Sequence, residues 1–137
     1  MGRSYLFECP KCAYRALVAG GAAEGARFCV QTILCSECRQ LHDAVTSLKV
    51  SLPRLAGDNG VGVRLAGKPK PLKAAPPFAA VLNRLPLPGR VRSRWQKFKP
   101  ACPVSAWHRV REWKAPDKCP RCGSFLEANA IPFREWD

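Results

Sequence analysis

Cysteines are the residues of this chain best suited to chemistry, because most of them come in close pairs. The sequence of 137 residues has eight cysteines, and three Cys-x-x-Cys motifs account for most of them. Two intervening residues form a tight turn from which both thiolates can reach one ion. Each motif can therefore supply half of a tetrahedral metal site. The motifs are Cys9 with Cys12, Cys35 with Cys38, and Cys119 with Cys122.

The first two motifs are separated by 22 residues, which is enough for two strands and a turn that return the chain to its start. The pattern C-x2-C-x22-C-x2-C is typical of a ribbon-like site for one structural zinc ion. A disulfide between such near neighbours would close a very small ring, so we expect metal binding instead, with iron as the alternative ion. The ligands expected for the first site are Cys9, Cys12, Cys35 and Cys38.

The third motif needs two further ligands, because a structural zinc site is closed. Cys102 and His108 are the nearest candidates, and they complete the pattern C-x5-H-x10-C-x2-C. We therefore expect a second zinc ion bound by Cys102, His108, Cys119 and Cys122. The spacing from Cys102 to His108 is not that of a standard motif, so His108 is also compatible with an ordinary surface or core residue. Cys29 is expected to be a small buried apolar residue or a substitute ligand in the second site.

Short β-strands are the elements that would position these ligands. Aromatic and aliphatic residues between turn signals predict them. Residues 41–52 fit neither the strand period nor the helix period, so their structure stays open. Residues 131–136 should return antiparallel to residues 123–126, with Phe133 and Trp136 in the core. The predicted strands are residues 4–8, 14–19, 27–34, 123–126 and 131–136.

The chain divides by composition into three parts. We expect an N-terminal zinc ribbon at 1–48, a basic Pro-rich connector at 49–100 and a C-terminal zinc-ribbon-like module at 101–137. Modules of about 40 residues bury too little apolar surface to fold alone, so metal binding would supply folding free energy. The predicted fold is therefore small, metal-stabilised and mainly β. Within the connector, apolar residues at i, i+4 and i+7 predict a short helix over 90–99.

Positive charge is concentrated in the middle of the chain. The net charge is +13, and residues 49–118 hold sixteen lysines and arginines against Asp58, Glu112 and Asp117. Such an excess indicates a polyanionic partner, most often nucleic acid, although a basic linker can also serve solubility alone. Trp95 is the candidate for stacking on bases; packing on the second module is its alternative role. The candidate phosphate contacts are Arg90, Arg92, Arg94, Lys97 and Lys99.

The motifs resemble those of the zinc-ribbon, or rubredoxin-like, group, in which short strands flank CPxC turns. An opening FECPKCAYRALVAGG, then TILCSEC, a distant CPRCG and a terminal WD is similar to small bacterial proteins with two zinc ribbons. The likeness covers residues 4–45 and 100–137, and it implies metal sites without catalytic residues. The chain departs from the pattern at Ala13 and Arg39, where many ribbons place glycine.

No catalytic constellation accompanies these sites: we find no phosphate-binding glycine loop, carboxylate pair or Ser-His-Asp arrangement. Apolar stretches of signal-peptide or membrane-spanning length are also missing, and reduced cysteines fit the cytoplasm. We therefore expect a cytoplasmic, non-enzymatic, zinc-binding protein that associates with RNA or DNA, without membrane or small-molecule partners. A protein-interaction adaptor that docks on a larger assembly and a rubredoxin-like electron carrier remain the alternatives.

Overall fold

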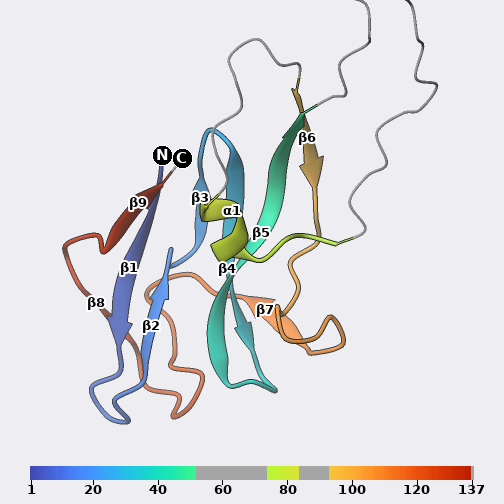
Figure 1. Ribbon diagram of the computed structural model, residues 1–137. Coiled ribbons are helices and arrows are strands. Elements are labelled where there is room, and N and C mark those ends of the chain that lie inside the picture. Colours follow the sequence, from blue (N-terminus) through green and yellow to red (C-terminus); the bar gives the residue numbers. More distant parts are fainter. Residues whose placement is uncertain (52–73, 84–92, 137) are drawn as a thin grey trace, which may run out of the picture.

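Two antiparallel sheets make up the described part of the protein. The computed structural model describes residues 1–51, 74–83 and 93–136. In the first sheet, β1 (Gly2–Glu8) pairs along one edge with β2 (Arg15–Val18). Along its other edge β1 pairs with β9 (Arg134–Trp136) and then with β8 (Glu127–Ala128). The N-terminal strand β1 therefore pairs with β8 and β9, two strands from the C-terminal part of the chain (Figure 1).

The second sheet is built around the hairpin of β4 (Phe28–Cys35) and β5 (Gln40–Ser51). Along its other edge β4 pairs first with β3 (Ala22–Glu24) and then with β7 (Val110–Glu112). Strand β6 (Ser93–Lys97) covers the free edge of β5. The helix α1 (Phe78–Leu82) lies against the same sheet and buries Val81 (Figure 1).

Two apolar clusters hold the sheets together. In one, the fully buried Trp113 meets Phe7 edge to face, with ring centroids 5.2 Å apart. In the other, Trp136 of β9 stacks on Phe28 of β4 at 4.4 Å between centroids, and Phe78 of α1 meets both rings. Since Trp136 and Phe28 belong to different sheets, their stacking fixes one sheet against the other.

The expected division into an N-terminal and a C-terminal module does not describe this arrangement. Strands β7, β8 and β9 come from the predicted C-terminal module, yet they pair with β4 and β1 of the N-terminal one. The predicted hairpin of 123–126 with 131–136 is also wrong. Residues 123–126 form only an isolated bridge, between Phe125 and Lys118, while β8 lies in the expected turn, and both β8 and β9 pair with β1. Phe133 is exposed, whereas Trp136 is buried as expected. Short segments gain more by adding to an existing sheet than by pairing with each other.

The predicted helix over 90–99 is also wrong where the structure describes it, since residues 93–97 form β6. The apolar spacing of Trp95 and Phe98 permits a helix, but one so short is marginal in water. The edge of β5 offers backbone hydrogen bonds instead, and the open segment at 41–52 becomes this strand. Residues 52–73 and 84–92 of the expected connector lie outside the described residues.

The described part of the chain has no helix long and apolar enough to cross a membrane. Its helix α1 has five residues, whereas a bilayer span needs about 20.

Candidate metal centres

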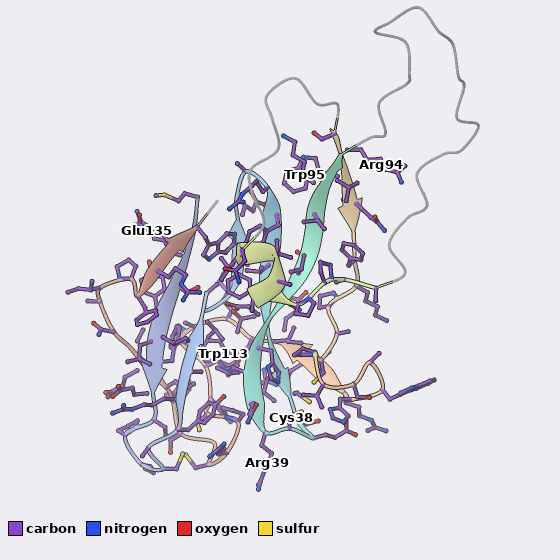
Figure 2. The ribbon with its side chains drawn as sticks, viewed as in Figure 1. Cys38, Arg39, Arg94, Trp95, Trp113 and Glu135 are labelled. Atoms are coloured by element: carbon purple, nitrogen blue, oxygen red, sulfur yellow. The ribbon has the colours of Figure 1, made fainter. Side chains whose placement is uncertain are left out.

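The cysteine motifs stand at hairpin tips and at one later loop. Cys9 and Cys12 lie in the turn between β1 and β2. Cys35 is the last residue of β4, and Cys38 lies in the turn that leads to β5. Figure 1 shows both tips at the same end of the molecule. Cys38 is labelled at the tip of its hairpin in Figure 2.

Each motif is followed by a residue in the left-handed backbone conformation. The φ angles are 60° at Ala13, 54° at Arg39 and 78° at Gly123. Backbone amides also point at sulfur: Cys38 N–H donates to Cys35 Sγ at 3.3 Å, and Arg121 N–H donates to Cys119 Sγ at 3.4 Å. Such bonds favour the thiolate over the thiol, so the turns are built for anionic sulfur.

The first centre joins the first motif to the last. Cys9 Sγ lies 3.3 Å from Cys122 Sγ, and Cys12 Sγ lies 3.6 Å from Cys119 Sγ. Cys9 and Cys119 are buried, whereas Cys12 and Cys122 are exposed. The segment after β7 returns to the β1–β2 hairpin and delivers this pair just before β8.

The second centre joins the middle motif to Cys102 and His108. Cys38 Sγ lies 3.6 Å from Cys102 Sγ, and His108 Nδ1 lies 3.3 Å from Cys38 Sγ and 3.6 Å from Cys35 Sγ. The segment after β6 carries Cys102 and His108 to the tip of the β4–β5 hairpin before it forms β7.

Each group of four can hold one metal ion. In both, the four candidate ligand atoms lie within 4.8 Å of one another. A tetrahedron with metal–sulfur bonds of about 2.3 Å has edges of about 3.8 Å, close to the observed separations. A disulfide would require sulfur atoms at about 2.05 Å, and every cysteine is free. The donor sets, four cysteines and three cysteines with one histidine, suit a thiophilic ion such as zinc.

The eight expected ligands are therefore brought together, but in a different partition. The expected first site grouped Cys9 and Cys12 with Cys35 and Cys38, and the structure instead groups them with Cys119 and Cys122. Cys35 and Cys38 join Cys102 and His108, so the second centre is nested within the first along the sequence. Closing a loop of 106 residues instead of 22 costs about 1.4 kcal/mol more in entropy. Sheet pairing easily outweighs so small a difference, which is why nearness in sequence misleads here.

A carboxylate lies beside His108 of the second centre, next to the ring nitrogen that does not face the cysteines. Glu37 Oε2 lies 3.8 Å from His108 Nε2 and accepts a hydrogen bond of 3.2 Å from Arg109 N–H. Nδ1 faces the ligand cluster, so with a metal ion bound there Nε2 would carry the proton and face Glu37. A carboxylate so placed orients a metal-binding imidazole and fixes its tautomer. Sequence reasoning missed Glu37, although its place between the two cysteines of a motif is visible.

Electrostatics within the clusters also favour a cation. Desolvation and the neighbouring sulfurs of Cys35 and Cys102 raise the pKa of Cys38 to about 12. At the first centre, the backbone N–H of Ser124 and neighbouring thiols lower the pKa of Cys122 to about 6. Clustered thiolates repel one another, so all the thiols of one centre can ionise together only when a cation neutralises them.

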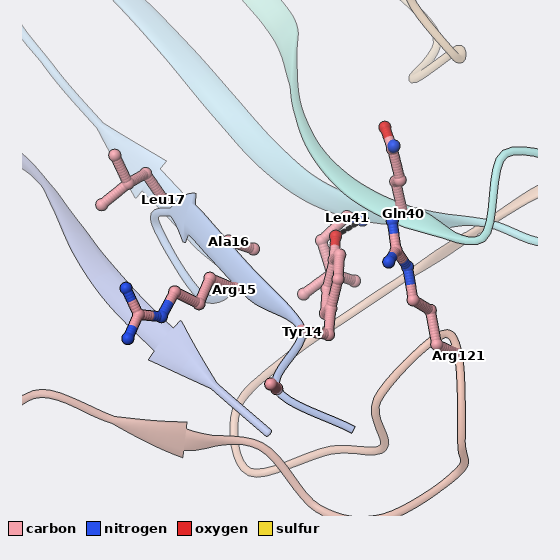
Figure 3. Close-up of a pocket in the computed structure, with 8 residues that line it drawn as sticks. Tyr14, Arg15, Ala16, Leu17, Gln40, Leu41 and Arg121 are labelled. Carbon is pink, nitrogen blue, oxygen red and sulfur yellow. Dashed lines mark hydrogen bonds between the residues drawn. The ribbon is translucent and has the colours of Figure 1, made fainter. Parts of the chain in front are cut away.

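Tyr14 connects the two hairpins beside the first centre. Its hydroxyl accepts a hydrogen bond of 2.8 Å from Leu41 N–H on β5, and the Arg121 guanidinium lies 4.9 Å from the centre of its ring. Figure 3 shows these residues around a pocket of about 410 Å³ that Arg15 and Gln40 also line. Burial raises the pKa of Tyr14, so its hydroxyl stays protonated.

The candidate nucleic-acid contacts lie on and beyond β6. Successive residues of a strand face opposite ways, so Arg94 points away from Trp95 (Figure 2). By the same alternation Lys97 lies on the side of Trp95. Trp95 is 46% exposed, and Arg94, Lys97 and Lys99 are exposed. The structure therefore groups Trp95 with Lys97 and separates Arg94 from them. Arg90 and Arg92 lie outside the described residues.

Comparison with known proteins found no matching family model, no matching curated protein and no matching solved structure.

Proposed function

We propose that this chain is a non-enzymatic nucleic-acid-binding protein whose fold depends on two structural zinc ions. Two observations support zinc: the chemistry of the donor sets, and the fact that protein ligands fill all four positions of each tetrahedral centre. Each centre has four protein ligands, which leaves no position open for a substrate or an activated water. A closed centre that joins segments distant in sequence stabilises a fold, as expected for two sheets with small cores.

Metal content tests the first half of this proposal. Protein purified without added metal should carry two zinc ions per chain by elemental analysis and show no visible absorption. Iron at the four-cysteine centre would give strong thiolate absorption in the visible range and would favour the electron carrier instead.

One sheet face carries the nucleic-acid half of the proposal. On β5, Leu48 and Val50 pack in the core, so Lys49 between them faces outward. Lys49 stands directly opposite Trp95 on β6, and Lys97 follows on the same side. We call Lys49, Trp95 and Lys97 the outer face of the second sheet. Among the described residues, no carboxylate forms an ion pair with either lysine.

An exposed indole between two ammonium groups suits a nucleic-acid strand. The lysines can neutralise phosphates while Trp95 contacts a sugar or base. The charge excess of residues 49–118 strengthens the attraction without requiring a base-specific contact. Sequence reasoning missed Lys49, because the pairing of β5 with β6 that places it beside Trp95 was not predicted.

Salt dependence of binding tests this face. Lys49→Ala with Lys97→Ala should weaken binding to a mixed-sequence oligonucleotide and reduce the slope of log affinity against log salt by about 1.4–1.8. Arg3→Ala with Arg15→Ala is the matched control: it removes the same charge from residues paired with Glu135 and Glu8. The control should leave the slope nearly unchanged.

Equal slopes in the two double variants would contradict the outer face as the binding surface. An absence of any salt-dependent binding by the wild-type protein would overturn the nucleic-acid proposal and favour the protein-interaction adaptor.

A further inference from the structure

A bulky apolar side chain projects from the second metal centre. Trp107 is 93% exposed, more than any other described large hydrophobic residue, and Val104 in the same loop is 69% exposed. A tryptophan usually buries most of its surface, because its ring contributes strongly to core and interface packing. Its near-complete exposure here is therefore unusual for this residue type.

The loop that presents Trp107 is short and held at both ends. It connects the ligands Cys102 and His108, so an ion in the centre would fix its start and its finish. Inside it, Trp107 N–H donates to Ser105 Oγ at 3.3 Å, and His108 N–H donates to Ser105 O at 3.2 Å. A side chain presented by a rigid loop loses little conformational entropy when a partner binds.

Exposed arginines border the same centre. Arg39 follows the ligand Cys38, and Arg109 follows the ligand His108. In the described part of the chain, no carboxylate forms an ion pair with either guanidinium. The nearby Glu37 is already engaged by His108 and by the Arg109 amide. Two exposed guanidinium groups are therefore available for phosphates beside this centre, which favours a nucleic-acid strand over an apolar protein groove.

From this geometry we infer that Trp107 is a stacking platform for single-stranded nucleic acid. The inference rests on the proposed function and specifies its substrate class. Single strands expose base faces that an indole can cover, whereas a duplex hides them within its own stack. Arg39 and Arg109 contact the flanking phosphates. Stacking is tolerant of sequence because every base has a π face, so little base preference accompanies it.

Fluorescence can isolate this contact in the full, zinc-loaded chain. The sequence has four tryptophans; Trp113 and Trp136 are buried, and Trp95 and Trp107 are exposed. In a Trp95→Phe background, only Trp107 is left to be quenched by a stacked base. The probes are an oligothymidylate of about 12 nucleotides and a duplex of the same length.

The single strand should quench Trp107 strongly and the duplex weakly. Trp107→Ala should weaken single-strand binding about 5- to 150-fold, and Trp107→Phe should restore part of the loss. The salt slope should not change in either variant, because an indole carries no charge. Phe133→Ala, which removes another exposed ring, is the control and should bind like the wild type. Unchanged zinc content would verify that the variants are folded.

The result that would overturn the inference is wild-type binding that falls with salt but is equal for both probes and unaffected by Trp107→Ala. The proposed function would survive that result. If the wild-type chain binds neither probe, the proposed function and this inference fail together.

Discussion

Backbone conformations next to the cysteine motifs carry a cost that single substitutions can reveal. Ala13 has φ of 60°, in a region that costs a residue with a Cβ about 1–2 kcal/mol. Glycine avoids this cost but loses about 0.5–1 kcal/mol through its freedom in the unfolded chain. Ala13→Gly should therefore raise the free energy of unfolding by about 0.5–1 kcal/mol, measured in urea with a fixed excess of zinc.

Gly123 supplies the reciprocal test of the same argument. Its φ is 78°, and a Cβ there would meet no other atom within 4 Å. Gly123→Ala should therefore lower the free energy of unfolding by about 1 kcal/mol through backbone conformation alone. Equal stability of both variants and the wild type would show that the motif turns relax and that these conformations cost nothing.

Asp43 has a largely desolvated carboxyl group with a pH-dependent effect on stability. Its oxygens accept hydrogen bonds from Ala19 N–H at 3.0 and 3.1 Å and from the Thr32 hydroxyl at 2.7 Å. Thr32 Oγ1 in turn accepts from Gly20 N–H and Gly21 N–H, so its own proton is free for Asp43. Desolvation outweighs these bonds and raises the pKa of Asp43 from 3.8 to about 6.

A raised pKa means that the folded chain holds a proton that the unfolded chain has released. Stability contributed by Asp43 is therefore greatest below pH 4 and is lost as pH rises to about 6. Relative to Asp43→Asn, the wild-type protein should gain about 1 kcal/mol between pH 7 and pH 5. Urea unfolding of both proteins at each pH measures the difference and cancels the pH dependence of zinc binding. A constant difference would contradict the shift.

At the scale of elements, Tyr14 joins the first hairpin to β5. Tyr14→Phe would leave the buried Leu41 N–H without an acceptor, and it should destabilise the protein by about 1–3 kcal/mol in urea unfolding. Tyr5→Phe is the matched control, because the described part of the chain provides its hydroxyl with no partner. Similar losses in the two variants would assign the effect to the hydroxyl's packing and not to its hydrogen bond.

Strands were predicted correctly where the pattern of side chains within the segment is enough to indicate a strand. The prediction failed where pairing with a distant strand determines the structure of the segment. The strands at 4–8, 14–19 and 27–34 are confirmed as β1, β2 and β4, because each has apolar residues that one face buries. Residues 93–97 could not be predicted in this way. Trp95 and Phe98 suit a helical stripe, and only the free edge of β5, distant in sequence, makes the strand more stable.

At the scale of the molecule, the nested pairing of the ligands predicts which cysteine variants behave alike. Cys12→Ser and Cys119→Ser should each leave one zinc ion per chain, and the double variant should retain that same ion. Cys12→Ser with Cys35→Ser should retain none. Cys29→Ser, outside both groups, should retain two. Elemental analysis after gel filtration gives the counts.

Stability provides a second measurement of the same pairing. The losses from Cys12→Ser and Cys119→Ser should not add, since one centre is lost only once, whereas those from Cys12→Ser and Cys35→Ser should be closer to additive. The losses of stability from Cys12→Ser and Cys35→Ser could instead fail to add, while those from Cys12→Ser and Cys119→Ser do add. The partition expected from the sequence would then be correct and the nested one wrong.

The ligand residues could be identified from sequence because two-residue spacing is a local property. Their partition could not, because it depends on which strands meet. Trp113 and Trp136 show the same limit: their apolar character predicts burial, but not that one packs on Phe7 and the other on Phe28. Contacts across more than 100 residues need the sheet pairing to be known first.

The nested order also has a consequence for synthesis on the ribosome. Cys9 and Cys122 are 113 residues apart, a distance that translation at about 5–20 residues per second covers in about 6–23 s. Throughout that interval the first hairpin has emerged with its thiols and no partner motif, while the second centre is completed earlier, once His108 appears. In the nascent chain the inner, second centre is therefore completed before the outer, first one. The cysteines synthesised first are the last to be protected from oxidation and foreign ions.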